Sequence, residues 1–189
     1  MCRRLNITDD PLTRLVSQLL GIHFVPHLGE DLKPSETVST IVFQKGCYQQ
    51  WDVPWGIKPS WAKRLIINAQ AESVANKATF KHGFAHQRVV VPCSGWYEWR
   101  KQAGSGRKEK FLFRNPDSSP LYIAGVIVNS NNLVTLTTKP NSQCAQYHHR
   151  MPFLVPEIGI YQWLTATEEE ARNYLSISHQ PIVNIELNG

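Results

Sequence analysis

The sequence predicts an α+β fold, a single domain with a curved, mainly antiparallel, barrel-like β-sheet core flanked by helices. Its length of 189 residues fits one domain, 1–189, more easily than two. Eight segments carry the short apolar and β-branched runs of strands, whereas only three carry helical spacing. Hydrophobic residues make up 42% and charged residues 19%, which favours a packed core and excludes general disorder.

The helical segments can be placed by their spacing and their ends. Residues 12–20 follow helical spacing, and Gly21 is their expected end. Residues 71–85 have helical character that Gly83 interrupts, and residues 167–175 open with a capping box. The glycine-containing stretch 102–107 is expected to be a hairpin loop. The expected strands are 37–43, 48–53, 88–91, 95–100, 110–114, 121–128, 133–138 and 182–187.

Composition excludes several classes of protein. No apolar run reaches the roughly 18–20 residues of a membrane span, and the first ten residues lack the apolar core of a signal peptide. The four cysteines are far apart, without a C-x-x-C pair. His82 and His86 could share a helical face, but no third metal ligand accompanies them. We therefore expect a cytoplasmic protein with free thiols, no metal, no cofactor and no membrane partner.

Basic residues are concentrated in the middle of the chain. The net charge is +5 overall, but residues 58–114 alone hold 12 Lys or Arg and three acids. Five of the six tryptophans lie in or just before this segment. Cations interleaved with flat rings suit single-stranded nucleic acid, because phosphates pair with the cations and unstacked bases lie on the rings. The alternative is that these tryptophans are core residues and the cations a solvated face.

Cys2 directly follows the initiator methionine. Removal of Met1 would leave an α-amine, with a pKa of about 7.7–8.0, beside a thiol of about 8.5. Such a 1,2-aminothiol attacks an aldehyde twice, first through the amine to give an imine and then through the thiolate to close a thiazolidine. It could also act as a nucleophile in acyl transfer. The alternative is an incidental cysteine at a chain end.

Three further side chains are candidates for chemistry. On a strand, Glu98 would share a face with Trp96, and desolvation there would raise the pKa of its carboxyl and suit it to acid–base work. His149 precedes an arginine that could hold it neutral, so that it could act as a base. Asn68 offers an amide that could fix a substrate oxygen. Each could instead be structural: a surface strand residue, a packed histidine or a turn residue.

The motifs form a recognisable series along the chain. They are Met-Cys at the start, W-G-I-x-P-x-W, N-A-x-A-E-S, V-P-x-x-G-W-Y-E-W, T-T and H-R-M-P. In this order, from Cys2 to about Val183, they resemble the SOS-response-associated peptidase family, whose members are abasic-site processing proteins. The resemblance implies that Cys2 attacks the ring-opened aldehyde of an abasic site in single-stranded DNA. The stable thiazolidine crosslink would protect the lesion in the DNA damage response.

The resemblance also implies roles for individual residues. Asn68 would position the cysteine and the sugar, Glu98 would be the acid–base group, and His149 would assist proton transfer and crosslink reversal. Self-removal of Met1 would account for the peptidase name. We expect a monomer, associated with the nucleoid when bound to DNA. The residues expected to contact DNA or build the pocket are Arg4, Trp55, Trp99, Thr138 and Arg150.

The sequence departs from the family pattern beside these residues. Arg3 replaces a glycine next to the nucleophile and would either crowd the backbone or add a phosphate contact. Gln70 replaces the arginine of the N-A-R motif, which removes a charge expected to hold DNA. Pro140 stands near the T-T motif where a small residue is usual. The catalytic groups themselves are all present.

Two other classes of function remain open from the residues. In an N-terminal-nucleophile amidohydrolase or thiol peptidase, Cys2, His149 and Asn68 would act on amides with turnover. In a non-catalytic single-strand binding module, binding would ignore whether an abasic site is present. The basic, tryptophan-rich middle favours a DNA ligand over a small amide.

Overall fold

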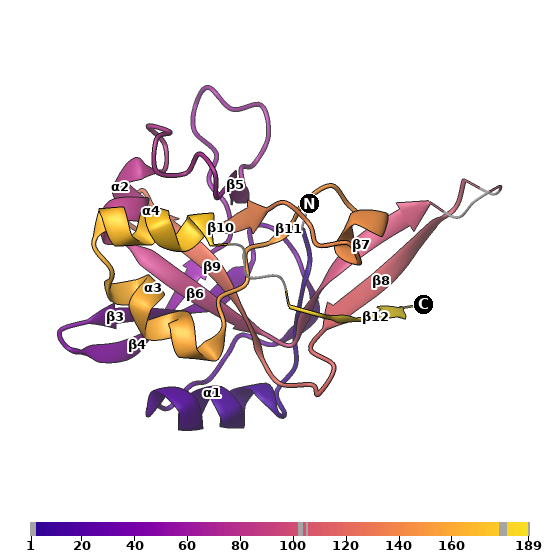
Figure 1. The fold of residues 1–189 in the computed structure, drawn as a ribbon, viewed down its shortest axis with the longest axis horizontal. Coiled ribbons are helices and arrows are strands. Elements are labelled where there is room, and N and C mark those ends of the chain that lie inside the picture. The colour runs from indigo at the N-terminus through magenta and orange to yellow at the C-terminus, as the bar shows by residue number, and fades with distance from the viewer. Residues whose placement is uncertain (1–2, 102–103, 105, 178–180, 189) are drawn as a thin grey trace.

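Two largely antiparallel β-sheets form the framework of the protein (Figure 1). The computed structural model describes residues 3–101, 104, 106–177 and 181–188. One sheet has the strand order β12-β8-β7-β1-β2, and the other has the order β11-β10-β9-β6-β3-β4 with β5 beside β10. The first sheet comprises β1 Leu5–Ile7, β2 Gly29–Leu32, β7 Gly95–Lys101, β8 Lys108–Arg114 and β12 Asn184–Leu187. The second comprises β3 Thr37–Gln44, β4 Cys47–Pro54, β5 Asn68–Gln70, β6 Arg88–Cys93, β9 Leu121–Val128, β10 Asn132–Thr138 and β11 Met151–Pro152.

Helices flank the sheets, so the α+β prediction is confirmed. In Figure 1, α2, α3 and α4 lie together at the left, and α1 lies at the bottom of the view. The pairings of the described strands leave both sheets open, so the core is not a closed barrel. The pairing of β5 with β10 is parallel, an exception to the antiparallel pattern. The helices are α1 Leu12–Leu20, α2 Lys81–His86, α3 Ile160–Thr165 and α4 Glu168–Ser176.

The core is centred on two strands that are buried along their whole length. Every residue of β6 and of β9 is buried, as their near-continuous apolar sequences require. Trp163 of α3 packs on this layer and donates its indole N–H to the carbonyl of Val89, 2.9 Å away. Arg88 at the start of β6 is also buried, and its guanidinium binds the carbonyls of Phe84 and Trp163, which ties α2 and α3 to the sheet.

The expected elements compare closely with the observed ones, with one clear error. All eight expected strands are present, and α1 ends at Gly21 with a left-handed φ of 65°. The capping box of α4 is formed by Thr167 and Glu170. The helix expected over 71–85 is wrong, because residues 71–80 form turns and only Lys81–His86 is helical.

Gly83 does not interrupt a helix but lies inside α2. A Cβ at this position would lie 2.3 Å from the carbonyl oxygen of Ile127, so the close approach of α2 to β9 needs a glycine.

Gly95 makes a similar close approach, and we expect Gly95→Ala to destabilise the fold. An added Cβ would lie 2.4 Å from the backbone oxygen of Phe113, so β7 would have to move away from β8. We expect a loss of about 1–3 kcal/mol in the free energy of unfolding, measured by denaturant titration. Gly29→Ala is the control, since its nearest neighbour is the side chain of Leu32 at 3.3 Å. Equal losses in the two variants would contradict this account.

Candidate active site

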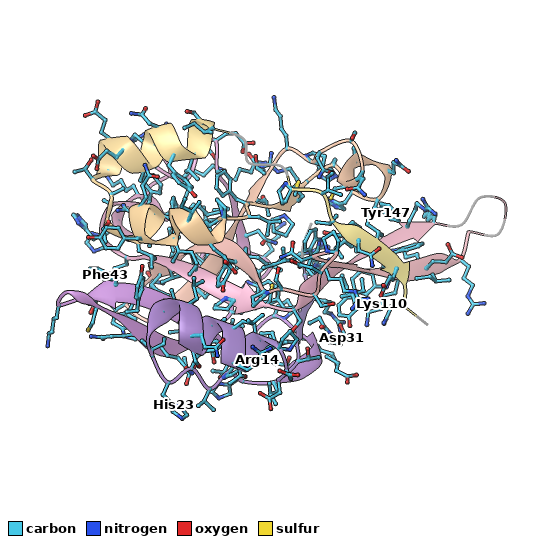
Figure 2. The ribbon with its side chains drawn as sticks, turned by 60° about the horizontal axis from the view of Figure 1, so that its bottom comes forward. Arg14, His23, Asp31, Phe43, Lys110 and Tyr147 are labelled. Atoms are coloured by element: carbon cyan, nitrogen blue, oxygen red, sulfur yellow. The ribbon has the colours of Figure 1, made fainter. Side chains whose placement is uncertain are left out.

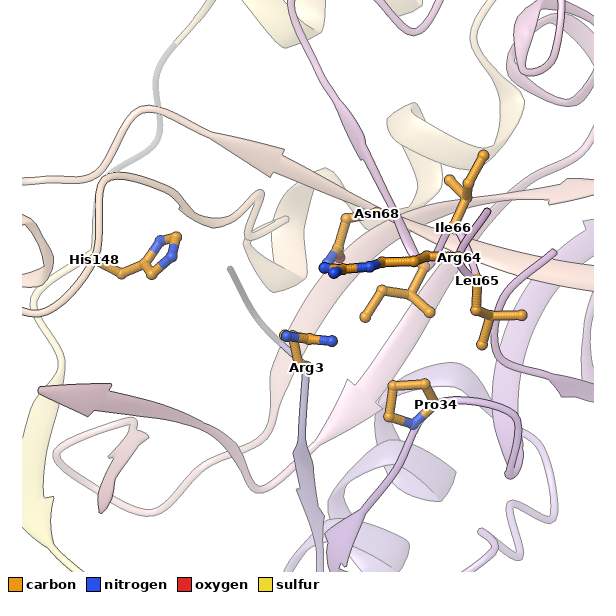
Figure 3. Close-up of a pocket in the computed structure, with 8 residues that line it drawn as sticks. Arg3, Pro34, Arg64, Leu65, Ile66, Asn68 and His148 are labelled. Atoms are coloured by element: carbon orange, nitrogen blue, oxygen red, sulfur yellow. The ribbon is translucent and has the colours of Figure 1, made fainter. Parts of the chain in front are cut away.

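Two adjoining cavities, of about 610 and 530 Å³, lie where the start of the described chain meets β5 and β7. They share Arg3, Pro34 and His148, so these three residues stand between them. Figure 3 shows the larger one, which we call the first cavity. It is lined by Arg3, Pro34, Arg64, Leu65, Ile66, Ile67, Asn68 and His148. The second cavity is lined by Arg3, Arg4, Pro34, Glu98, Trp99, Lys108 and His148.

Glu98 contributes a carboxyl group to the second cavity. It lies in β7 opposite Phe111 and is only 5% exposed, and Trp96 two residues earlier is buried as well. Burial raises the pKa of Glu98 to about 7, although the positive charge of Arg3 acts in the opposite direction. Near neutral pH, the carboxyl is therefore divided between its acid and its base form, as a proton-transfer group requires.

The structure brings His148, not His149, to the cavities. His148 is half-buried and lines both of them, whereas His149 is exposed. The two rings are in contact in a tilted arrangement, with their centroids 4.2 Å apart. Burial and the neighbouring His149 lower the pKa of His148 to about 4, so its ring is neutral at neutral pH. Nδ1 of His148 lies 3.0 Å from the backbone nitrogen of Arg150 and 3.2 Å from its carbonyl oxygen, so Arg150 fixes the orientation of the ring.

An aromatic cluster holds the segment that carries His148. The ring of Tyr147 meets Phe111 and Phe113 edge-on, with centroid distances of 4.8 and 5.2 Å. The guanidinium of Arg100 lies 4.6 Å from the Tyr147 centroid, a cation–π contact. These partners all belong to β7 and β8, so the sheet that carries Glu98 also fixes the position of His148.

Asn68 opens β5 and faces the first cavity. It pairs with Thr135 of β10, whose hydroxyl donates to Oδ1 of Asn68 over 2.6 Å and so orients the carboxamide. Trp55 is fully buried behind this wall and cannot contact DNA. Its indole N–H donates to the carbonyl of Ile67 (3.1 Å), next to Asn68, so its part is to build the pocket.

Cations and aromatic rings are in contact next to Arg4 and Trp99, two residues that line the second cavity. The ammonium of Lys110 lies 3.9 Å from the centre of the Tyr97 ring and 5.9 Å from that of Trp99. Arg4 lies 5.9 Å from the same Trp99 ring. The carboxylate of Asp31 binds both cations, at 2.9 Å for Arg4 and 3.1 Å for Lys110. Lys110 and Asp31 are labelled in Figure 2.

The other residues expected at DNA are placed differently. Arg150 forms a two-bond ion pair with Glu72 (2.9 and 2.7 Å) and also donates to the carbonyl of Thr137, so it braces the segment beside His148. Thr138 is half-buried at the end of β10, and Gln70 is exposed at the end of β5.

Cys2 lies outside the described residues, but Arg3, to which it is bonded, lines both cavities. The tryptophans of the basic middle segment differ in burial, because Trp55 and Trp96 are core residues whereas Trp61 is 68% exposed.

Among the described residues, no three His, Cys, Asp or Glu side chains are grouped as metal ligands. None of the described helices has the length and apolar character needed to cross a membrane.

Comparison with known proteins identifies the family. The sequence model of the SOS response associated peptidase (SRAP) family matches residues 1–187. The chain belongs to the SRAP family. A similar SRAP relative is the abasic site processing protein YoqW of Bacillus subtilis, 26% identical over 208 residues that cover 96% of this chain and 87% of YoqW. The abasic site processing protein YobE of the same organism is 26% identical over 87% of this chain and 82% of YobE.

Solved structures share the SRAP fold seen here. A protein from Bordetella bronchiseptica superposes with a TM-score of 0.82 at 20% identity, covering all of both chains. A phage-related protein from the same organism gives a TM-score of 0.80 at 19% identity, over 99% of this chain and 94% of its own. A protein from Bacteroides thetaiotaomicron gives 0.74 at 17% identity, over 98% and 91%.

Proposed function

We propose that this protein processes abasic sites in single-stranded DNA by forming a covalent thiazolidine crosslink through Cys2. The observation that carries the proposal is the buried carboxyl of Glu98, which faces a cavity beside the neutral ring of His148. Arg3, bonded to Cys2, lines the same cavity. Relatives over most of the chain are abasic site processing proteins by name, which supports the same substrate.

The chemistry needs an aldehyde, an amine and a thiol. In the ring-opened abasic sugar, C1′ is an aldehyde carbon. The α-amine of Cys2 adds to C1′, the resulting carbinolamine loses one water, and an imine remains. The thiolate then adds to the imine carbon and the nitrogen takes up a proton, which closes a five-membered ring of C1′, N, Cα, Cβ and S. One water is released, and no oxidant, metal or cofactor is consumed.

Glu98 and His148 divide the proton transfers. Protonated Glu98 donates to the hydroxyl that leaves as water, and the carboxylate takes up a proton when the sugar ring opens. His148, whose Nδ1 is held by the backbone of Arg150, hydrogen-bonds a sugar oxygen through Nε2. Asn68, oriented by Thr135, positions the sugar from the first cavity. His148 takes the role that the sequence motif suggested for His149.

The walls of the second cavity suit a single strand. Lys108 supplies a charge for phosphates, and so do Arg4 and the nearby Lys110, whose two charges share the single carboxylate of Asp31. The half-buried ring of Trp99 offers a face for an unstacked base. A duplex would keep its bases stacked and unavailable to that ring. The α-amine of Cys2 is free only once Met1 has been removed, and self-removal by the thiol of Cys2 would be the peptidase activity of this protein.

Incubation with abasic and intact single strands, followed by a denaturing gel, tests the proposal. We expect a heat-stable adduct with the abasic strand alone. Equal non-covalent binding of both strands without an adduct would instead indicate a binding module. Turnover of small amides without an adduct would indicate an amidohydrolase.

A matched pair of variants distinguishes the two neighbouring histidines. We expect His148→Ala to slow adduct formation roughly tenfold to a hundredfold, because a proton-transfer partner in the cavity is lost. His149→Ala removes an exposed ring and should leave the rate within about twofold of wild type. Single-turnover rates on an abasic oligonucleotide measure both. A larger loss of rate in His149→Ala than in His148→Ala would indicate that His149 is the proton-transfer group.

A further inference from the structure

The guanidinium groups of Arg3 and Arg64 converge in the first cavity. Arg3 reaches it from the start of the described chain, and Arg64 reaches it from the connection between β4 and β5. Figure 3 shows the end of Arg64 beside the carboxamide of Asn68, with the guanidinium group of Arg3 below them. Two cations from distant parts of the sequence therefore point at the same space, directly beside the proposed sugar position.

No carboxylate stands among the described residues that line this cavity. Its walls are otherwise Pro34, Leu65, Ile66 and Ile67, with the neutral carboxamide of Asn68 and the ring of His148. The charge of Arg3 also acts on Glu98, but Glu98 lines the second cavity and not the first. An anion that entered the first cavity would meet two guanidinium groups and no carboxylate among its described lining residues.

We propose that Arg3 and Arg64 form a binding site for a backbone phosphodiester of the DNA strand, next to the abasic sugar. The proposal rests on the proposed function for the identity of that sugar. Guanidinium groups bind phosphate oxygens through paired, charge-assisted hydrogen bonds, and partly apolar walls strengthen such contacts. The site assigns a role to Arg64, which no sequence motif singled out. It would also replace the phosphate contact that is lost at the end of β5, where the uncharged, exposed Gln70 stands in place of the family arginine.

The test uses Cys2→Ala protein and a single strand that carries an unreactive tetrahydrofuran in place of the abasic sugar, so that only non-covalent binding is measured. Arg64→Gln should weaken binding at low salt about tenfold, the loss expected for one charge-assisted contact. The slope of log K against log[salt] should become shallower by about 0.7, the increment for one phosphate on a single strand.

The control is Lys63→Gln, which removes one positive charge from the adjacent, exposed residue that does not line the cavity. It should change affinity by less than twofold. Equal effects of the two variants would overturn the site.

A second measurement identifies the phosphate. Single phosphates on either side of the tetrahydrofuran are replaced by uncharged methylphosphonates. At one internal position, the methylphosphonate should weaken binding about tenfold for the protein that keeps Arg64. It should have almost no effect on Arg64→Gln, because that contact is already absent. Additive losses at every internal position, or coupling only to a terminal phosphate, would overturn the proposal. Adduct formation by the wild-type protein on an abasic strand is measured separately. Absence of an adduct would refute the proposed function, whereas the binding measurements alone test the phosphate site.

Discussion

Cys2→Ala should abolish the heat-stable adduct with abasic single-stranded DNA and leave non-covalent binding intact. A thiazolidine needs an amine and a thiol on adjacent carbons, and in this chain only residue 2 can offer both once Met1 is removed. The cations and rings proposed to hold the strand lie directly before β1 and on β7 and β8, and the substitution leaves them unchanged. A denaturing gel reports the adduct, and an anisotropy titration reports binding.

Three controls separate the amine from the thiol. Cys2→Ser keeps the amine and should give at most an unstable imine that a reductant can trap. A non-removable tag ahead of Cys2 should also prevent the crosslink, since it blocks the amine. Cys47→Ala removes an exposed free thiol elsewhere and should crosslink like wild type. An undiminished adduct in Cys2→Ala, or full activity with Met1 retained, would refute the mechanism.

The sequence predicts side-chain positions well where the local structure is periodic. Strand alternation placed Glu98 and Trp96 on one face of β7, and both are buried. The choice between His148 and His149 has no such basis, because they lie in an irregular segment after the short 3₁₀ turn Cys144–Gln146, where neighbouring side chains do not alternate. Tertiary contacts of Tyr147 with β8 decide which of the two rings faces the cavities.

The sequence also does not predict the short elements of the fold or the positions of residues in loops. Strand β5 has three residues and is defined by parallel pairing with β10, far away in the chain, so no local pattern marks it. Helix α3 and the strands β1, β2 and β11 are similarly brief. Arg64 looks like any surface cation until the fold places it opposite Arg3. Trp55 matched a family motif, but only its burial shows that it builds the wall and does not contact DNA.

Glu98→Gln should slow crosslink formation by roughly 10²–10⁴-fold, the usual contribution of a general acid–base group. The amide keeps the shape and the burial of the side chain but cannot transfer a proton. Wild-type rates should show an inflection near pH 7, where Glu98 passes from its acid form to its base form. Glu98→Gln should lack this inflection. Single-turnover rates measured across pH 5–9 give both results.

The same substitution should stabilise the fold, and this distinguishes a proton-transfer role from a structural one. A carboxyl whose pKa is higher in the folded than in the unfolded protein binds its proton more tightly when folded. Below the unfolded pKa the group is protonated in both states, so its burial does not lower the free energy of unfolding there. As pH rises from about 4.5 to 7, stability is lost, in total by about 3 kcal/mol for a rise of this size. Glu98→Gln avoids that loss and should unfold at higher denaturant concentration than wild type at pH 8, with little difference at pH 4. A variant that is both less stable at pH 8 and as fast as wild type would reassign Glu98 to a structural role.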